Sequence, residues 1–339
     1  MGIVCGLDIH RTQVTFDWVD TETGEGSRGK LAPANRETFR RWLQQFAGHE
    51  VDVVVEGCTG WRFIVEETLA AGMRAHLADP AEASSRMHGP KRRAKTDKVD
   101  ARGLRELAEQ GRVPESWIPP AQVLEIRTAV RLYHDLLTER AAWLHRIHAT
   151  LFHQGAVAQK QLLRGDRDRL HDSDMLTPAG RDAVKSILRV IDALDAEINR
   201  IRQQLTQFAG KQPGCRELQK EYGVGKLTSV VIWSELGDCR RFSSSADAVR
   251  HTGLDITIYS SNGKRAKPHL ARQGPALLRW ALFEAGRCGS RPTSPDHAYW
   301  QQAAKRQDKK RAGISVGRKI TRRCHHRLRA LGDEAFAEV

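Results

Sequence analysis

Two runs of apolar residues in the middle of the sequence follow alternating steps of three and four positions. The first comprises Val123, Ile126, Val130, Tyr133, Leu137, Leu144, Ile147 and Leu151, with Arg140 at the skipped position. The second comprises Val184, Ile187, Ile191, Leu194, Ile198, Ile201, Leu205 and Phe208. This spacing predicts two long helices with coiled-coil seams, linked by the polar residues 165–178. The seams could close a hairpin within one chain or join subunits, and both alternatives stay open.

The first eighty residues alternate between short strands and helices. Strand patterns cover residues 3–9, 13–19, 51–56 and 73–77, with a further short strand expected at 29–31, and helical spacing covers 36–46 and 61–71. The predicted order is strand, strand, strand, helix, strand, helix, strand, which is the α/β order of an RNase H-like fold completed by one more helix. We therefore predict an RNase H-like domain over residues 1–120, a helical coiled-coil hairpin over 121–212 and a basic, mostly helical domain over 213–339.

The formal net charge of the chain is +14, and the excess of cations is concentrated late in the sequence. From Lys264 onward, basic residues outnumber acidic ones by about three to one. Such a surface favours a polyanionic partner, most commonly nucleic acid. Within this region Cys324, His325 and His326 resemble a set of metal ligands, but the surrounding arginines favour a solvated basic helix.

Several classes of protein are disfavoured by what the sequence lacks. The six cysteines form no C-x-x-C pair, which argues against a zinc ribbon or a disulfide framework. The turn Gly223-Val-Gly225 could hold a phosphate or simply begin a helix, and it is not an ATP-binding loop. No signal peptide and no apolar stretch of membrane-spanning length are visible, so we expect a cytoplasmic, nucleoid-associated protein.

Four acidic residues are placed so that they could share a metal site: Asp8, Glu56, Asp97 and Asp100. In an RNase H-like fold the first strand, the fourth strand and the last helix meet at one edge. Carboxylates about 5 Å apart repel by roughly 3 kcal/mol per pair, so such a cluster needs cations. Oxygen ligands favour Mg²⁺ or Mn²⁺, which support phosphoryl transfer. Cations that could contact nucleic acid precede the last two acids: Lys91, Arg92, Arg93 and Lys95.

A serine-bearing loop, Tyr259-Ser-Ser-Asn-Gly-Lys264, lies in the basic region. It is followed by the candidate nucleic-acid ligands Lys264, Arg265, Lys267 and Arg272. A hydroxyl among cations could attack a phosphodiester if a base or metal removed its proton. By sequence alone, Ser-Ser-Asn-Gly is more often an ordinary turn.

The chain resembles, over nearly its full length, transposases of the insertion sequence 110 family, whose relatives include the Piv and MooV DNA invertases. The N-terminal part of the resemblance lies in Gly6-Leu-Asp-Ile-His10, Glu56-Gly57, Thr59-Gly60 and Lys95-Thr-Asp-Lys-Val-Asp-Ala101. The C-terminal part lies in Gly223-Val-Gly225, Glu235-Leu-Gly-Asp238, Phe242, Gly253-Leu-Asp255, Tyr259-Ser-Ser261, Gly263-Lys264 and Leu277-Leu-Arg-Trp-Ala-Leu282.

This resemblance implies that Asp8, Glu56, Asp97 and Asp100 form a RuvC-like metal site and that Ser261 is the nucleophile of a covalent phosphoserine intermediate. It also implies a site shared between subunits of a homodimer or homotetramer, and a guide RNA transcribed from the element. Asn262 stands where the family usually has glycine, and Ser260 is a second candidate nucleophile. Residues 271–275 also depart from the family pattern. The alternatives are a RuvC-like structure-specific endonuclease that uses water, and a decayed copy that binds without cutting.

Overall fold

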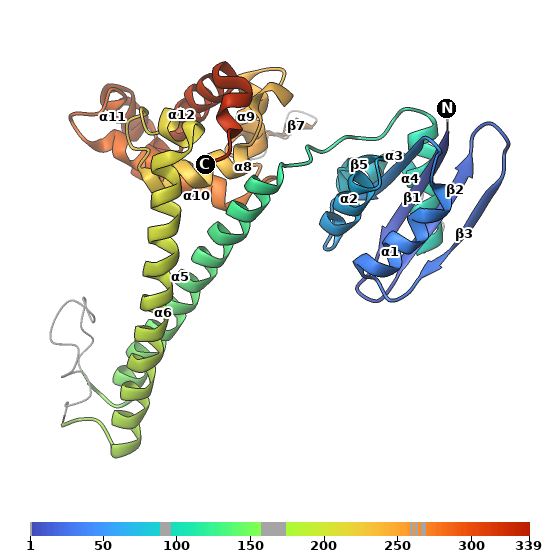
Figure 1. The fold of residues 1–339 in the computed structure, drawn as a ribbon. Coiled ribbons are helices and arrows are strands. Elements are labelled where there is room, and N and C mark those ends of the chain that lie inside the picture. The colour runs from blue at the N-terminus through green and yellow to red at the C-terminus, as the bar shows by residue number, and fades with distance from the viewer. Residues whose placement is uncertain (1, 89–95, 157–173, 258–259, 262–263, 266–268) are drawn as a thin grey trace. The chain divides into compact units, whose positions relative to one another are not determined.

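The computed structural model describes residues 2–88, 96–156, 174–257, 260–261, 264–265 and 269–339. The chain divides into two compact units, Met1–Ile118 and Pro119–Val339 (Figure 1). The first unit contains a mixed sheet with helices, and the second is almost entirely helical. No helix of the described residues is long and apolar enough to cross a membrane.

The first unit is built on a five-stranded sheet with the order β3-β2-β1-β4-β5. The strands are β1 (Ile3–Ile9), β2 (Val14–Asp20), β3 (Gly26–Leu31), β4 (Val51–Glu56) and β5 (Arg74–Ala78). The helical elements are α1 (Arg36–Leu43), η1 (Gln44–Phe46), α2 (Trp61–Ala70), α3 (Pro80–His88) and α4 (Asp97–Glu109). β1 pairs antiparallel with β2 and parallel with β4. The element order predicted for the first eighty residues is confirmed, with β3 beginning three residues earlier than expected.

The two faces of this sheet pack against different helices. On one face, alternate residues of β1 and β4, including Cys5 and Val53, form a core with residues of α1, η1 and α2. On the other face, Val54 packs with Leu104 and Leu107 of α4. Because side chains alternate along a strand, the residues of β1 and β4 on this second face are the even-numbered ones.

Gly6 allows α4 to lie directly on β1. A Cβ atom at this position would come within 2.1 Å of the Ala101 carbonyl oxygen and 2.5 Å of the Arg105 amide nitrogen. Any side chain would therefore push the helix away from the strand. Arg105 fixes the same contact from the helix side, because its Nε donates a 2.6 Å hydrogen bond to Asp17 on β2.

In the second unit, two long helices, α5 (Ala121–His153) and α6 (Pro178–Lys211), pack along each other (Figure 1). Near the ends furthest from the helical body, Ile147 and Leu151 pack with Val184 and Ile191. The two predicted helices are confirmed, and part of their seam closes within one chain. Arg140, at the skipped seam position, donates from Nη2 to Asp195 of α6 at 3.2 Å.

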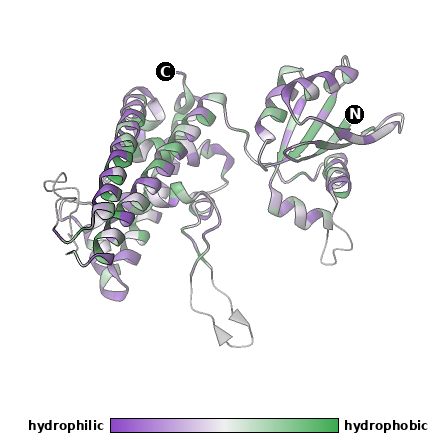
Figure 2. Cartoon of the chain, turned by 90° about the horizontal axis from the view of Figure 1, so that it is seen from below, coloured by the Kyte–Doolittle hydropathy of each residue, from purple (hydrophilic) through white to green (hydrophobic). Residues whose placement is uncertain are grey.

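The remainder of the second unit is a bundle of shorter helices with two small strand pairs. Its helical elements are α7 (Pro213–Leu218), α8 (Lys226–Leu236), η3 (Cys239–Arg241), α9 (Ser245–Thr252), α10 (Ala276–Arg287), η4 (Cys288–Ser290), α11 (His297–Arg306), α12 (Lys309–Leu331) and η5 (Gly332–Phe336). The strand pairs are β6 (Ile256–Thr257) with β9 (His269–Leu270) and β7 (Ser260–Ser261) with β8 (Lys264–Arg265). Figure 2 shows hydrophobic and hydrophilic residues on the same helices, as amphipathic packing requires.

Helix α12 is the central packing element of this bundle, and it is not the solvated helix that its arginines predicted. Cys324 and His325 are buried, with exposed fractions of 0% and 2%. The prediction was wrong because neighbouring elements supply acids that neutralise one basic row of the helix. Those acids are distant in sequence, so a count of local charges could not reveal them.

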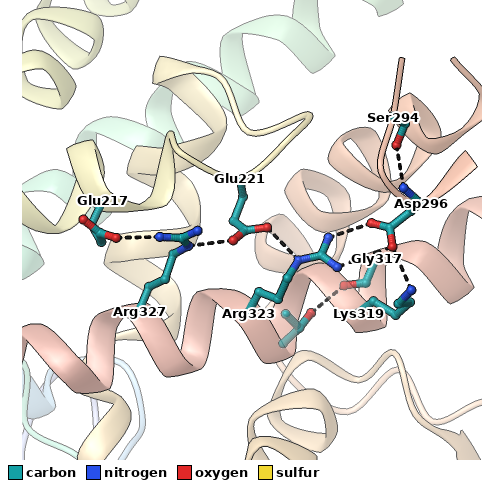
Figure 3. A network of polar contacts seen from close by, with 9 residues as sticks. Glu217, Glu221, Ser294, Asp296, Gly317, Lys319, Arg323 and Arg327 are labelled. Carbon is teal, nitrogen blue, oxygen red and sulfur yellow. Dashed lines mark hydrogen bonds and ion pairs between the residues drawn. The ribbon is translucent and has the colours of Figure 1, made fainter. Parts of the chain in front are cut away.

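The neutralised row forms a continuous ion-pair network along α12 (Figure 3). Its bonds run from Arg327 to Glu217 and Glu221, from Arg323 to Glu221 and Asp296, and from Lys319 to Asp296, all between 2.6 and 2.8 Å. Glu221 and Asp296 are buried, and each of these two carboxylates pairs with two cations. The pairs compensate for the loss of hydration of the buried charges. These three basic side chains therefore stabilise the fold and are occupied by protein acids.

The turn Gly223-Val-Gly225 has a packing role in the structure. Gly223 has a left-handed φ of 89°, and a Cβ atom there would come within 2.6 Å of the Ala285 carbonyl oxygen. The close approach of this turn to α10 (Ala276–Arg287) requires glycine at this position. The ordinary helix entry, one of the two alternatives from the sequence, thus has a direct structural reason.

Candidate functional site

Asp8 and Glu56 lie side by side at one end of the central strands. Leu7 and Val55 are paired in the parallel register of β1 and β4, so the two acids are the next residues along each strand. Neighbouring strands are separated by about 4.8 Å, and both residues are even-numbered. They therefore belong to the sheet face that α4 covers.

The other two acids lie in the first turn of α4. Thr96 caps this helix by accepting from the Val99 amide, which makes Asp97 the first helical residue. Asp97 and Asp100 are three residues apart and thus share one side of the helix. Carboxylates are also favourable at a helix N-terminus for structural reasons alone, since they complement the helix dipole.

His10 connects the strand acid with the helix acid. Its Nε2 atom lies 3.2 Å from Asp8 Oδ2 and 3.2 Å from Asp97 Oδ1. Gln13 Nε2 donates to the second oxygen of Asp97 at 3.3 Å. The potential ligand atoms of Asp8, His10 and Asp97 lie within 4.8 Å of one another. We call the four acids together with His10 the acidic centre.

The electrostatics of the acidic centre agree with this geometry. Burial raises the pKa of Asp8; His10 opposes the rise, and the charges of Asp97 and Asp100 add to it. Burial alone would raise the pKa of Asp97 as well, but the charge of His10, the hydrogen bonds of Asp97 and the more distant Lys30 outweigh it and lower that pKa. Asp8, Asp97 and Asp100 therefore interact through their charges.

The thiol of Cys58 gives evidence that Glu56 lies near Asp8. The pKa of this half-buried thiol is raised first by burial and then by the negative charges of Asp8 and Glu56. The thiol therefore lies within the field of both strand acids. Together with the strand register, this places Glu56 beside Asp8 at one end of the sheet.

The donor set of the acidic centre fits a divalent cation. Its carboxylate oxygens are hard ligands that suit Mg²⁺ or Mn²⁺, and the half-buried Asp8 has a repulsion from its neighbours that a cation would relieve. His10 adds one nitrogen, which Mn²⁺ accepts more readily than Mg²⁺ does. Sequence reasoning quoted His10 only as part of a motif. The signal for it was its position two residues after Asp8, on the same side of the chain.

The predicted basic and serine residues are only partly described. Lys91, Arg92, Arg93, Lys95 and Lys267 lie outside the described residues. In the backbone register of β7 and β8, Ser261 lies opposite Lys264 and Ser260 opposite Arg265. Arg272 has a left-handed φ of 56° and is exposed. The acids belong to the first unit, and the serines and Arg272 belong to the second.

Comparison with known protein families gives two matches that divide along the chain. Residues 5–153 match the model of a DEDD transposase of the IS110 type, described as "Transposase". Residues 215–301 match the model described as "Transposase IS116/IS110/IS902 family". The first match contains all four acids of the acidic centre, and the second contains the serine loop.

Two individual proteins that are similar to this chain are also transposases of insertion sequence elements. The chain is similar to the transposase for insertion sequence element IS1111A of Coxiella burnetii, with 20% identity over 76% of this chain and 71% of the relative. It is also similar to the transposase for insertion sequence element IS1328 of Yersinia enterocolitica, with 22% identity over 69% of this chain and 70% of the relative.

Among solved structures, RuvC of T. thermophilus in complex with a Holliday junction substrate is similar to 34% of this chain and 100% of its own. The identity is 12% and the TM-score 0.25. The two family matches cover residues 5–153 and 215–301, and the two relatives are matched over 71% and 70% of their own lengths. The chain belongs to the IS110 family of transposases.

Proposed function

We propose that this transposase cuts and rejoins DNA by metal-dependent phosphoryl transfer, with an RNase H-like first unit that holds Mg²⁺ or Mn²⁺. The observation that carries the proposal is the convergence of Asp8 and Asp97 on His10, from a strand and a helix that are distant in sequence. Glu56 and Asp100 would complete the ligand set. A bound divalent cation would supply charge stabilisation for the reacting phosphate and would lower the pKa of an attacking hydroxyl.

The nucleophile that we propose is Ser261. Its Oγ would form a bond to phosphorus while one phosphate ester bond of the DNA breaks. The serine proton would pass to a base in the acidic centre, and the departing sugar oxygen would take up a proton. The ester energy is then retained in the phosphoserine and is available for rejoining, so no ATP is needed. Ser260, the neighbouring residue, is the alternative nucleophile.

In this proposal the active site is composite, with the acids of one subunit acting on Ser261 of another. The proposed protein has three parts: an RNase H-like domain over residues 1–120, a helical hairpin over 121–212 and a basic domain over 213–339. Leu132 and Phe152 on α5 have exposed fractions of 46% and 79%, which leaves apolar surface on the long helices for contacts in a homodimer or homotetramer. A guide RNA would contact the basic residues of the last part.

The experiment is to incubate the full chain with Mg²⁺, RNA from the end of its element and end-labelled donor DNA. We expect a protein–DNA adduct that survives denaturation. Ser261→Ala and Asp97→Asn should both abolish it, whereas Glu37→Gln, which changes an exposed carboxylate that pairs with Arg41 on its own helix, is the matched control.

Each other outcome assigns a different function. An adduct that persists in Ser261→Ala but not in Ser260→Ala would move the nucleophile by one residue. Free cut DNA without an adduct would support the endonuclease that uses water. Binding without cutting would support a decayed copy.

A further inference from the structure

The second unit contains a groove outside the acidic centre and the serine strand pair. It lies between the β6–β9 pair and the start of α12, and it has a volume of about 720 Å³. Its lining residues, all of them described, are Ile256, His269, Leu270, Arg272, Gln307, Asp308, Lys310, Arg311, Ile314 and Arg318. We call it the α12 groove.

The charge of the α12 groove is strongly positive. Arg272, Lys310, Arg311 and Arg318 line it, and its one acidic lining residue is Asp308. Asp308 makes two interactions with Arg311: it accepts a hydrogen bond from the Arg311 amide at 2.8 Å and pairs with the Arg311 guanidinium at 3.3 Å. The first turn of α12 also contains no acidic residue, so its cations lie at the positive end of the helix dipole. A polyanion in the groove would relieve this repulsion.

Arg272 and Arg318 are held in place by the backbone around the groove. The backbone at Arg272 is fixed by its amide, which donates to the Gly253 carbonyl at 3.1 Å, and it is the one described residue other than glycine with a left-handed φ. Arg318 Nε donates to the Leu254 carbonyl at 2.6 Å. A strained position that presents a cation at a groove is a frequent sign of a binding site.

Three of the residues that line the α12 groove are apolar: Ile256, Leu270 and Ile314. We call them the apolar floor, and Ile256 has an exposed fraction of 48%. A ligand that matches both features combines phosphate groups with a planar, weakly polar part, as a nucleotide does. The volume lies within the range of sites for small ligands, whereas a double helix is far too wide to enter.

We propose that the α12 groove binds an unpaired nucleotide of DNA, with its phosphates against Lys310, Arg311 and Arg272 and its base on the apolar floor. Thr257 at the end of β6 is four residues from Ser261, so the two positions are at most about 14 Å apart along an extended chain. The nucleotide would therefore lie close to the scissile phosphate. The identity of the nucleic acid as the transposition substrate rests on the proposed function.

The test measures equilibrium binding of the full chain to a short single-stranded DNA and to a blunt duplex of the same sequence, in EDTA. The variant Lys310→Ala/Arg311→Ala removes two groove cations. Arg202→Ala/Lys211→Ala removes two exposed cations of α6 and is the matched control. We expect the groove variant to weaken single-strand binding about tenfold or more and to reduce the log–log salt slope by about 1.4, since each phosphate contact contributes about 0.7 on single strands.

A second variant tests the apolar floor without changing charge. Ile256→Ser alters an exposed side chain, so the fold should be preserved. We expect roughly threefold to tenfold weaker single-strand binding, no change for the duplex and an unchanged salt slope. A fluorescent purine analogue in the oligonucleotide should brighten on binding to the wild-type chain and less so with Ile256→Ser, because its base becomes unstacked in the groove.

Three results would overturn the proposal. One is equal loss of single-strand and duplex binding in the groove variant, which would indicate a general phosphate-binding surface. Another is a groove variant that behaves like the α6 control. A third is an effect on single-stranded RNA only, which would assign the groove to RNA. All binding measurements are made without metal, so they can be interpreted even if the chain fails to cut DNA. If the chain cuts DNA but the groove variant binds normally, the groove proposal is rejected and the proposed function stands.

Discussion

Two regions of this transposase gather charged side chains, and they do so in opposite ways. At the acidic centre of the first unit, Asp8 and Asp97 share one histidine, and the charges of Asp97 and Asp100 raise the pKa of Asp8. Along α12 of the second unit, three cations alternate with three carboxylates in a continuous chain of ion pairs (Figure 3). The comparison teaches that like charges gathered at one place are typical of a site for a ligand, whereas alternating opposite charges are typical of a part of the scaffold.

The largest contrast is expected from removing one carboxylate at the acidic centre. Asp8→Asn should reduce adduct formation by at least about a hundredfold, because a ligand of the proposed metal is lost. The same change should leave the metal-free protein as stable as before or up to about 1 kcal/mol more stable, because it removes repulsion. Adduct assays and thermal unfolding in EDTA measure both effects. A clear loss of stability would show that the acids are structural.

Removing one carboxylate from the ion-pair network of α12 should instead lower the stability of the protein. Glu221→Gln leaves Arg323 and Arg327 without their shared carboxylate, so we expect the free energy of unfolding to fall by about 3 kcal/mol. Glu284→Gln, which breaks a surface pair with Arg287 on one helix, should cost less than about 0.5 kcal/mol. Denaturant titration compares the two variants. An equal loss of unfolding free energy in both variants would contradict the scaffold role of the network.

Acid should destabilise the second unit through a half-buried histidine, His251. Burial and then the charge of Arg241 lower the pKa of His251 from 6.5 to about 4. The unfolded chain therefore binds the proton more readily, and the stability that neutral His251 contributes is lost as the pH falls from about 6.5 to about 4. The loss should be about 3 kcal/mol, since one pKa unit corresponds to about 1.4 kcal/mol. His251→Gln should remove this part of the pH dependence, and an unchanged profile would refute the assignment.

The smallest effect is expected from adding metal. Mg²⁺ or Mn²⁺ at about one hundred times its Kd should stabilise the first unit by about 2.7 kcal/mol. Asp97→Asn should abolish this gain, whereas Glu221→Gln should keep it, since the network has no free carboxylate to offer. Limited proteolysis with and without metal distinguishes the two units. Protection of both units in Asp97→Asn would place the metal elsewhere.

The sequence allowed much of the first unit to be predicted, because its signals are local. The apolar runs of β1 and β4 located the strands that carry Asp8 and Glu56, and Asp97 was predicted at the start of a helix, which the structure confirms. The role of His10 was missed because a histidine just after a strand is a common neutral residue, and its contact with Asp97 depends on a helix that is distant in sequence. The burial of His325 was mispredicted because the compensating acids, Glu217, Glu221 and Asp296, come from other parts of the chain.

The α12 groove was beyond sequence reasoning for the same reason. Arg272 was identified as a nucleic-acid ligand, but its partners Lys310 and Arg311 come from another element. The apolar floor is assembled from Ile256, Leu270 and Ile314, which have no common periodicity. Contacts between distant segments decide which cations remain available, and local composition does not report them.

The close contact at Gly6 has an evolutionary consequence. Every residue other than glycine would lift α4 from β1, and with it the two helix acids from the two strand acids. Under the proposed mechanism, a single codon change at this position would therefore silence a copy of the element while its whole acidic signature remains readable in the genome. Counting intact DEDD motifs would then overestimate how many copies can still move.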